Sequence, residues 1–147
     1  MRGEPEPVPP PLLQAVYEHA AAEFPRECCG LLLGPRGAAL DEARPCVNAC
    51  AEAHRAFSLG PDDLWRLAAG LDGARPARVL YHSHVDAPAC FSAEDERQAL
   101  LGGEAPAWPL LHLVVEVRAG APRGATLHEW APALRRFQQI RRYETGA

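Results

Sequence analysis

Two histidines and a nearby aspartate are the residues of this chain best suited to bind a metal ion. His82 and His84 lie two residues apart and Asp95 follows, in the spacing His-x-His-x7-Ser-x-x-Asp. If the histidine segment is an extended strand, its period of two places both imidazoles on one face. Two imidazoles and one carboxylate leave one position of a tetrahedral zinc ion open, as catalytic zinc sites require. The metal lowers the pKa of the water at that position to about 7, and a carboxylate that is not a ligand must then accept the proton.

The same residues have other interpretations. Ser92-x-x-Asp95 at a helix start is close to a capping box, which explains both side chains without a metal but does not explain the histidine pair. Two histidines and a carboxylate also form the triad of non-haem iron enzymes, although their usual His-x-Asp/Glu order is absent. An amidohydrolase-type site is excluded, because its barrel needs more than about 200 residues and the chain has 147.

The segments around these residues alternate between helical and strand patterns. Apolar periodicity and proline positions predict helices over residues 11–23, 61–71 and 92–101. Apolar runs predict strands over residues 29–34, 38–43, 57–59, 78–84, 108–117 and 125–130, the first two joined as a hairpin, while residues 135–143 fit either a helix or a strand. This alternation predicts an α/β layered domain with a mixed sheet.

Composition narrows the class of protein. The length predicts a single domain over residues 11–147, preceded by a flexible tail over residues 1–10. The absence of a long apolar run and of a signal-like N-terminus leads us to expect a cytoplasmic protein that does not cross a membrane. A net charge of −4 argues against nucleic acid or an anionic membrane as a partner. An odd number of cysteines, five, argues against a disulfide framework. We expect Cys46 and Cys50 to be free thiols, the alternatives being metal ligands or a regulatory disulfide.

Two motifs together resemble a known family. The histidine–serine–aspartate run is similar to the signature of the JAMM metalloproteases, also called the MPN+ or JAB domain family. Their upstream glutamate sits in a segment like Pro-x-Glu-x-Cys-Gly, followed by apolar residues and a glycine. This chain has Pro25-Arg-Glu27-Cys-Cys29-Gly30-Leu-Leu-Leu-Gly34, and Asn48 with the segment 57–61 matches the family's central part more loosely. The chain departs from the family at Val85 and Phe91, where proline is usual.

The resemblance implies a fold and a set of residue roles. The fold is a cytidine-deaminase-like α/β domain, with a three-layer arrangement of a mixed sheet flanked by helices. His82, His84 and Asp95 would hold one zinc ion per chain. Glu27 would be the general acid/base, and the Ser92 hydroxyl would stabilise the oxyanion.

The resemblance also implies a reaction and a partner. The reaction is hydrolysis of a peptide or isopeptide bond after the C-terminal tail of a ubiquitin-like protein, which for so short a chain would be a sulfur carrier of the β-grasp kind. The tail would add to a sheet edge near the metal. The alternative is a non-catalytic scaffold that only binds partners, although scaffolding relatives generally lack the metal residues that this chain retains.

The remaining histidines and cysteines have simpler interpretations. His112 and His128 lie in predicted strands, and we expect them to be core or strand-surface residues rather than a fourth ligand. Cys28 and Cys29 directly follow Glu27, and no helix N-terminus or basic partner is evident that would lower a thiol pKa, so we expect them to serve packing. Cys90, in the loop before Ser92, is the better candidate for a thiol near the substrate.

Overall fold

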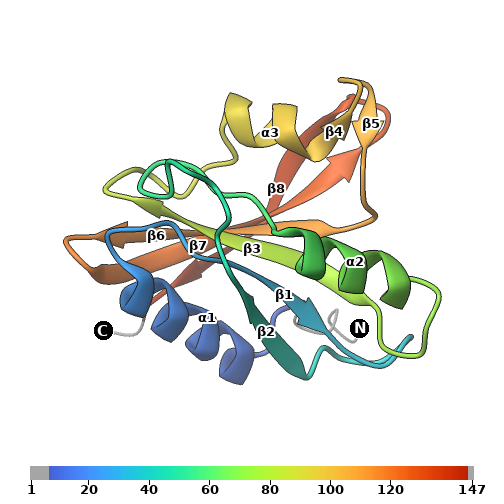
Figure 1. Ribbon diagram of the computed structural model, residues 1–147, viewed down its shortest axis with the longest axis horizontal. Coiled ribbons are helices and arrows are strands. Elements are labelled where there is room, and N and C mark those ends of the chain that lie inside the picture. The colour runs from blue at the N-terminus through green and yellow to red at the C-terminus, as the bar shows by residue number, and fades with distance from the viewer. Residues whose placement is uncertain (1–6, 146–147) are drawn as a thin grey trace, which may run out of the picture.

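The computed structural model describes residues 7–145 and places most of them around one sheet (Figure 1). The helices are α1 (Pro10–Glu23), α2 (Pro61–Gly70) and α3 (Ala93–Ala99). The main sheet contains β1 (Cys29–Leu33), β2 (Glu42–Cys46), β3 (Ala77–Val85), β6 (Leu111–Arg118), β7 (Ala121–Ala131) and β8 (Arg136–Glu144). Two short strands, β4 (Leu100–Leu101) and β5 (Ala105–Pro106), pair beside α3.

The sheet has the order β2-β1-β3-β6-β7-β8. Strands β3 and β6 are parallel, and every other neighbouring pair in this sheet is antiparallel. The predicted mixed sheet is therefore confirmed.

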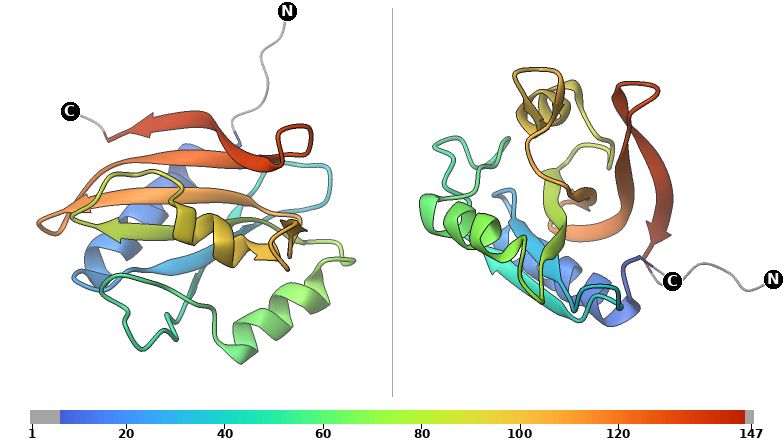
Figure 2. Two further views of the ribbon diagram at one scale, coloured as in Figure 1. Left: turned by 90° about the horizontal axis from the view of Figure 1, so that it is seen from above. Right: turned by 90° about the vertical axis from the view of Figure 1, so that its right-hand side faces the viewer.

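The two faces of the sheet are covered by different helices, because successive side chains of a strand point to opposite sides. On one face α1 buries Leu12, Val16 and Ala20 in a cluster with Tyr81 and Leu113. On the other face Leu67 of α2 packs in a cluster with residues that alternate with the first set, namely Leu31, Leu33 and Leu80. Figure 2 shows α2 and α3 lying on the side of the sheet away from α1. The predicted three-layer arrangement is present.

The second strand lies later in the chain than the predicted 38–43. The ladder with β1 begins at the Leu33–Glu42 pair, next to the bond from the Asp41 amide to the Leu33 carbonyl (2.9 Å). Residues 35–41 form a longer connection, in which Leu40 turns into the core. The strand contains Pro45, which lacks a donor, and this is tolerated because β2 is an edge of the sheet.

The structure also decides the conformation of two other segments. The predicted strand at 57–59 makes only a single isolated bridge, between Asn48 and Leu59. The ambiguous segment 135–143 forms β8, paired with β7.

The predicted flexible tail covers residues 1–10, of which residues 1–6 lie outside the described part of the chain. Val8 is only 1% exposed and belongs to the α1 core, and Pro10 is the first residue of α1. Proline suits the first turn of a helix because its missing N–H would have no partner there. Residues 7–10 therefore pack with the domain rather than forming a tail, and a single domain that ends at residue 147 stays a prediction. Within residues 7–145, no helix has the length and apolar character needed to cross a membrane.

Candidate metal centre

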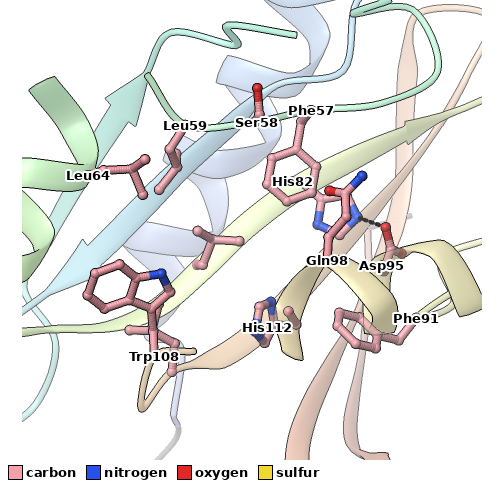
Figure 3. Close-up of a pocket in the computed structure, with 13 residues that line it drawn as sticks. Phe57, Ser58, Leu59, Leu64, His82, Phe91, Asp95, Gln98, Trp108 and His112 are labelled. Carbon is pink, nitrogen blue, oxygen red and sulfur yellow. Dashed lines mark ion pairs between the residues drawn. The ribbon is translucent and has the colours of Figure 1, made fainter. Parts of the chain in front are cut away.

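The carboxyl end of β3 presents two imidazoles to the face that carries α2 and α3. His82 and His84 are both buried, and their Nε2 atoms lie 3.2 Å apart. Asp95, in the first turn of α3, places Oδ1 at 3.3 Å from His82 Nε2 and Oδ2 at 3.1 Å from His84 Nε2. Figure 3 shows the Asp95 carboxylate turned toward the His82 ring. The structure thus brings together the three side chains that the sequence spacing singled out.

The separations among these atoms suit a tetrahedral metal ion. Zinc–ligand distances of about 2.0–2.1 Å place neighbouring ligands of a tetrahedron about 3.3–3.4 Å apart. The observed separations are 3.1, 3.2 and 3.3 Å. Among the described residues this is the one group of three or more His, Cys, Asp or Glu side chains close enough to share a metal. The donor set fits zinc and leaves a fourth position open, while the assignment of these residues as zinc ligands stays a prediction.

The surroundings of each imidazole fix its orientation. His84 Nδ1 lies 2.8 Å from the Pro88 carbonyl and donates to it, so the lone pair of Nε2 faces the cluster. The ring of Phe57 stacks on His82 at 4.4 Å between centroids, with 20° between the planes. Burial lowers the pKa of His82 and keeps it neutral, as a metal ligand must be.

Asp95 is held by the helix that it caps. The Ser92 hydroxyl accepts from the Asp95 amide and the Ser92 amide donates to Asp95 Oδ2, both at 3.0 Å, which completes a capping box. The capping-box interpretation of the sequence is therefore confirmed, and the same carboxylate also faces both histidines. Burial alone raises the pKa of Asp95, but its interactions with the two histidines, His82 and His84, outweigh burial and hold the pKa well below its usual range. The aspartate is thus anionic.

Glu27 lies beside the cluster because of the pairing between β1 and β3. Cys29 pairs with His82, and the Ser83 amide bonds the Cys28 carbonyl at 3.1 Å, so Glu27 comes next to His84. The glutamate is 6% exposed. Burial raises its pKa to about 7, with His84 lowering it and Asp95 raising it. A carboxyl group with a pKa near neutrality can both accept and donate a proton.

Asn48 organises the segment around Glu27, a role that the loose family match did not reveal. Its side-chain amide donates to the carbonyls of Glu27 and Ala56, both at 2.9 Å. Its oxygen accepts from the amides of Cys50 at 2.9 Å and Ser58 at 3.2 Å. All the hydrogen-bonding capacity of this buried amide is therefore used to join Glu27 to the loop that carries Phe57. A lone asparagine in a loop otherwise suggests only a turn.

A cavity of about 220 Å³ opens beside the metal ligands, and sequence reasoning did not predict it. His82 and Asp95 form part of its wall, and the other walls come from segment 57–59, α2, α3 and residues 108–110 (Figure 3). Its lining is mostly apolar and includes Leu59, Leu64 and Trp108. Pockets of this character bind the apolar parts of ligands.

Burial agrees with the packing roles expected of four other residues, namely His112, His128, Cys28 and Cys29. His112 and His128 are buried, and burial lowers their pKa values to about 3 and about 4, so both are neutral. Cys28 and Cys29 are buried free thiols whose pKa values are raised by burial, to about 11 for Cys28, which makes them poor nucleophiles. Cys90 is exposed, and Cys46 and Cys50 are free as well.

The fold and the site define an α/β domain with a candidate His-His-Asp metal centre. Comparison with known proteins gives the family. Residues 9–131 match the family described as prokaryotic homologs of the JAB domain. The chain belongs to this family. The resemblance read from the two sequence motifs is therefore confirmed.

Two curated relatives match most of the chain. The tail tip assembly protein K of Escherichia phage N15 is 35% identical over 115 residues, which is 76% of this chain and 43% of that protein. The chain thus spans less than half the length of this relative. A desampylase of Haloferax volcanii is 31% identical over 123 residues, which is 81% of this chain and 80% of that protein.

Solved structures share the fold. A protein of Salinibacter ruber has a TM-score of 0.63 at 29% identity, covering 93% of this chain and 90% of that chain. A protein of Desulfitobacterium hafniense has a TM-score of 0.65 at 23% identity, covering 89% and 86%. A JAB1/MPN domain protein of Archaeoglobus fulgidus has a TM-score of 0.51 at 18% identity, covering 88% and 90%. The last two likenesses concern the fold alone.

Proposed function

We propose that the protein is a zinc-dependent peptidase or isopeptidase that cleaves after the C-terminal tail of a ubiquitin-like protein, of the sulfur-carrier β-grasp kind. The observation that carries the proposal is the convergence of His82, His84 and Asp95 with a buried glutamate beside them. Membership of the prokaryotic JAB family and the similarity to a desampylase support it. The catalytic domain is proposed to run from the first helix to the end of the chain. The expected cytoplasmic location stays a prediction.

The metal ligands and Glu27 divide the chemistry between them. His82, His84 and Asp95 would hold zinc, which supplies a Lewis acid and lowers the pKa of a water molecule toward neutrality. Glu27 accepts the proton of the attacking water and delivers it to the leaving nitrogen. Its pKa of about 7 suits both halves of this transfer.

Ser92 is proposed to stabilise the charge that develops on the carbonyl oxygen of the substrate. Its oxygen accepts from the Asp95 amide, and its O–H can still donate to a substrate. A fixed donor aimed at a developing oxyanion contributes a factor of about 10² to 10³ in rate. The half-buried position of the side chain leaves it accessible to a substrate.

The apolar cavity beside His82 and Asp95 is proposed to hold a side chain of the substrate tail. Phe57 connects the cavity to the metal centre, because it lines the cavity and stacks on His82. A tail fixed in the cavity would therefore present its scissile bond next to the metal ligands.

The test is incubation of the zinc-loaded protein with sulfur-carrier proteins that bear C-terminal extensions, read by intact mass. We expect loss of a mass equal to the extension with the native protein and no loss with Glu27→Gln at equal zinc content. Two further outcomes separate the alternatives. Binding of the carriers without cleavage by the zinc-loaded protein supports a scaffold, and iron in place of zinc in the purified protein supports an iron enzyme.

A further inference from the structure

The loop between β3 and α3, residues 86–91, carries the hydrogen-bond acceptor for a metal ligand. Its Pro88 carbonyl accepts from His84 Nδ1 at 2.8 Å. The loop also leads directly into Ser92 and the helix that bears Asp95. The chain lacks proline at positions 85 and 91 on either side of the loop, so other contacts must hold it in shape.

The residue after Pro88 is clamped from both sides of its backbone. The Ala89 amide donates to Glu116 Oε1 of β6 at 3.1 Å. The Ala89 carbonyl accepts from the Thr126 hydroxyl of β7 at 2.7 Å. Thr126 is fully buried and Ala89 is 8% exposed, so the bond between them lies out of water, and loss of the hydroxyl would leave the Ala89 carbonyl buried without a partner. The bond to Glu116 is only partly buried.

His128, on the same strand β7 as Thr126, fixes the orientation of the Thr126 hydroxyl. His128 Nε2 lies 2.8 Å from Thr126 Oγ. Because the proton of the hydroxyl is directed to Ala89, its oxygen accepts and His128 Nε2 donates. The hydroxyl therefore has one direction in which to donate, toward the loop.

An aromatic cover shields this arrangement at the other end of the loop. Phe91 packs on His112 at 4.9 Å, on His128 at 5.4 Å and on Phe137 at 4.7 Å between ring centroids. The Phe137 amide donates to Glu96 of α3 at 3.1 Å, which ties the same helix to β8. The loop is thus anchored at two points after Pro88, namely Ala89 and Phe91.

We propose that Thr126 and Glu116 are positioning residues for the metal. By clamping Ala89 they fix the neighbouring Pro88 carbonyl, which orients His84 so that its Nε2 meets His82 Nε2 and Asp95. In this chain, the hydrogen bonds from Glu116 and Thr126 hold the loop in one conformation, as prolines at both ends of the loop would. This inference rests on the proposed function only in that a zinc ion binds at the cluster.

The test measures metal affinity rather than hydrolysis. The Kd for Zn²⁺ is determined by competition with a chromophoric chelator, and the visible absorption of Co²⁺ reports the geometry of the ligands. We expect Thr126→Val, which keeps the shape of the side chain, to weaken Zn²⁺ binding by about 10- to 100-fold, as loss of an outer hydrogen bond to a ligand does elsewhere. Thr126→Ser restores the hydroxyl, and we expect it to stay within about threefold of the native protein.

A second pair of variants makes the test independent of the folding of Thr126→Val. Glu116→Ala removes the acceptor for Ala89 at a position where the carboxylate is partly exposed, whereas Glu116→Gln keeps an acceptor oxygen. We expect the alanine variant alone to weaken Zn²⁺ binding and to alter the Co²⁺ spectrum. Thermal unfolding of the metal-free proteins shows whether the hydrogen bonds to Ala89 serve general stability or the orientation of the metal ligand. Variants that lower the melting temperature but keep the native Kd would overturn the proposal and leave the proposed function standing, while a native protein that binds neither ion would overturn both.

Discussion

The buried carboxyl of Glu27 predicts a specific dependence of stability on pH in the metal-free protein. Its pKa is about 7 in the folded protein, against 4.5 for an unburied glutamate, and burial is the main cause. A folded-state pKa above the unfolded value means that the folded protein binds the extra proton between these two pH values. The contribution of Glu27 to stability is therefore fully present below pH 4.5 and is lost as the pH rises through about 7.

The size of the effect follows from the shift. One pKa unit corresponds to about 1.4 kcal/mol, so the shift of Glu27 corresponds to at most about 3 kcal/mol across this pH window. The Glu27→Gln variant carries no titrating group at this position and lacks the effect. We therefore expect the variant to gain stability relative to the native protein, by up to about 3 kcal/mol, between pH 4.5 and pH 8.

The assay is urea unfolding of both proteins in a metal chelator at several pH values. The difference between the two free energies of unfolding removes the contributions of other groups that titrate alike in both proteins. Asp41→Asn is a suitable control, because this aspartate is exposed and far from the cluster, bound instead by Arg75. A difference between native protein and Glu27→Gln that stays constant from pH 4.5 to pH 8 would refute the assignment of a raised pKa to Glu27.

Further predictions concern the other residues of the site. Glu27→Gln is expected to keep zinc while kcat falls by about 10²- to 10⁴-fold, measured by metal analysis and intact-mass turnover. Asp95→Asn is expected to lose both zinc and turnover, because the amide is a weak ligand, and retention of stoichiometric zinc would contradict its role. Ser92→Ala is expected to lower kcat by about 10²-fold or more and to weaken the α3 cap by about 1 kcal/mol, whereas Ser92→Thr keeps the cap, as unfolding experiments will show. Asn48→Ala is expected to cost about 3 kcal/mol in urea unfolding, because four backbone groups lose their partner, one in a buried hydrogen bond and three in partly buried ones.

The histidine pair of the metal cluster could be predicted from the sequence, because its two residues are neighbours on one strand. The period of two along a strand places His82 and His84 on one face whatever the rest of the fold does. The position of Glu27 beside the cluster could not be predicted in this way. It depends on the pairing of Cys29 with His82 in neighbouring strands, and no residue pattern within either strand specifies that pairing. Only the resemblance to a family singled out this glutamate among the acids of the chain.

The last strand shows why part of the fold could not be read from periodicity. Phe137, Ile140 and Tyr143 recur every three residues, which favours a helix as much as a strand. In the structure the register of β8 shifts opposite Leu127 and His128, so that an extra residue is accommodated near Ile140. Phe137 therefore faces the aromatic cover at Phe91, while Tyr143 faces the α1 core. A bulge that exchanges the two faces leaves no simple period in the sequence.

The capping box and the metal site began as competing explanations of Asp95, and the structure makes them one arrangement. The bonds to and from Ser92 hold the aspartate in a single orientation before any ion binds. A ligand that is already fixed loses little rotamer freedom on binding, so the cap contributes to affinity by preorganisation. The start of α3 also places its amide dipoles next to an anionic carboxylate, which favours the charge state that a cation requires. A Ser-x-x-Asp pattern at a helix start is thus compatible with a metal ligand, and the histidine pair is the feature that distinguishes this chain from one in which the pattern only caps a helix.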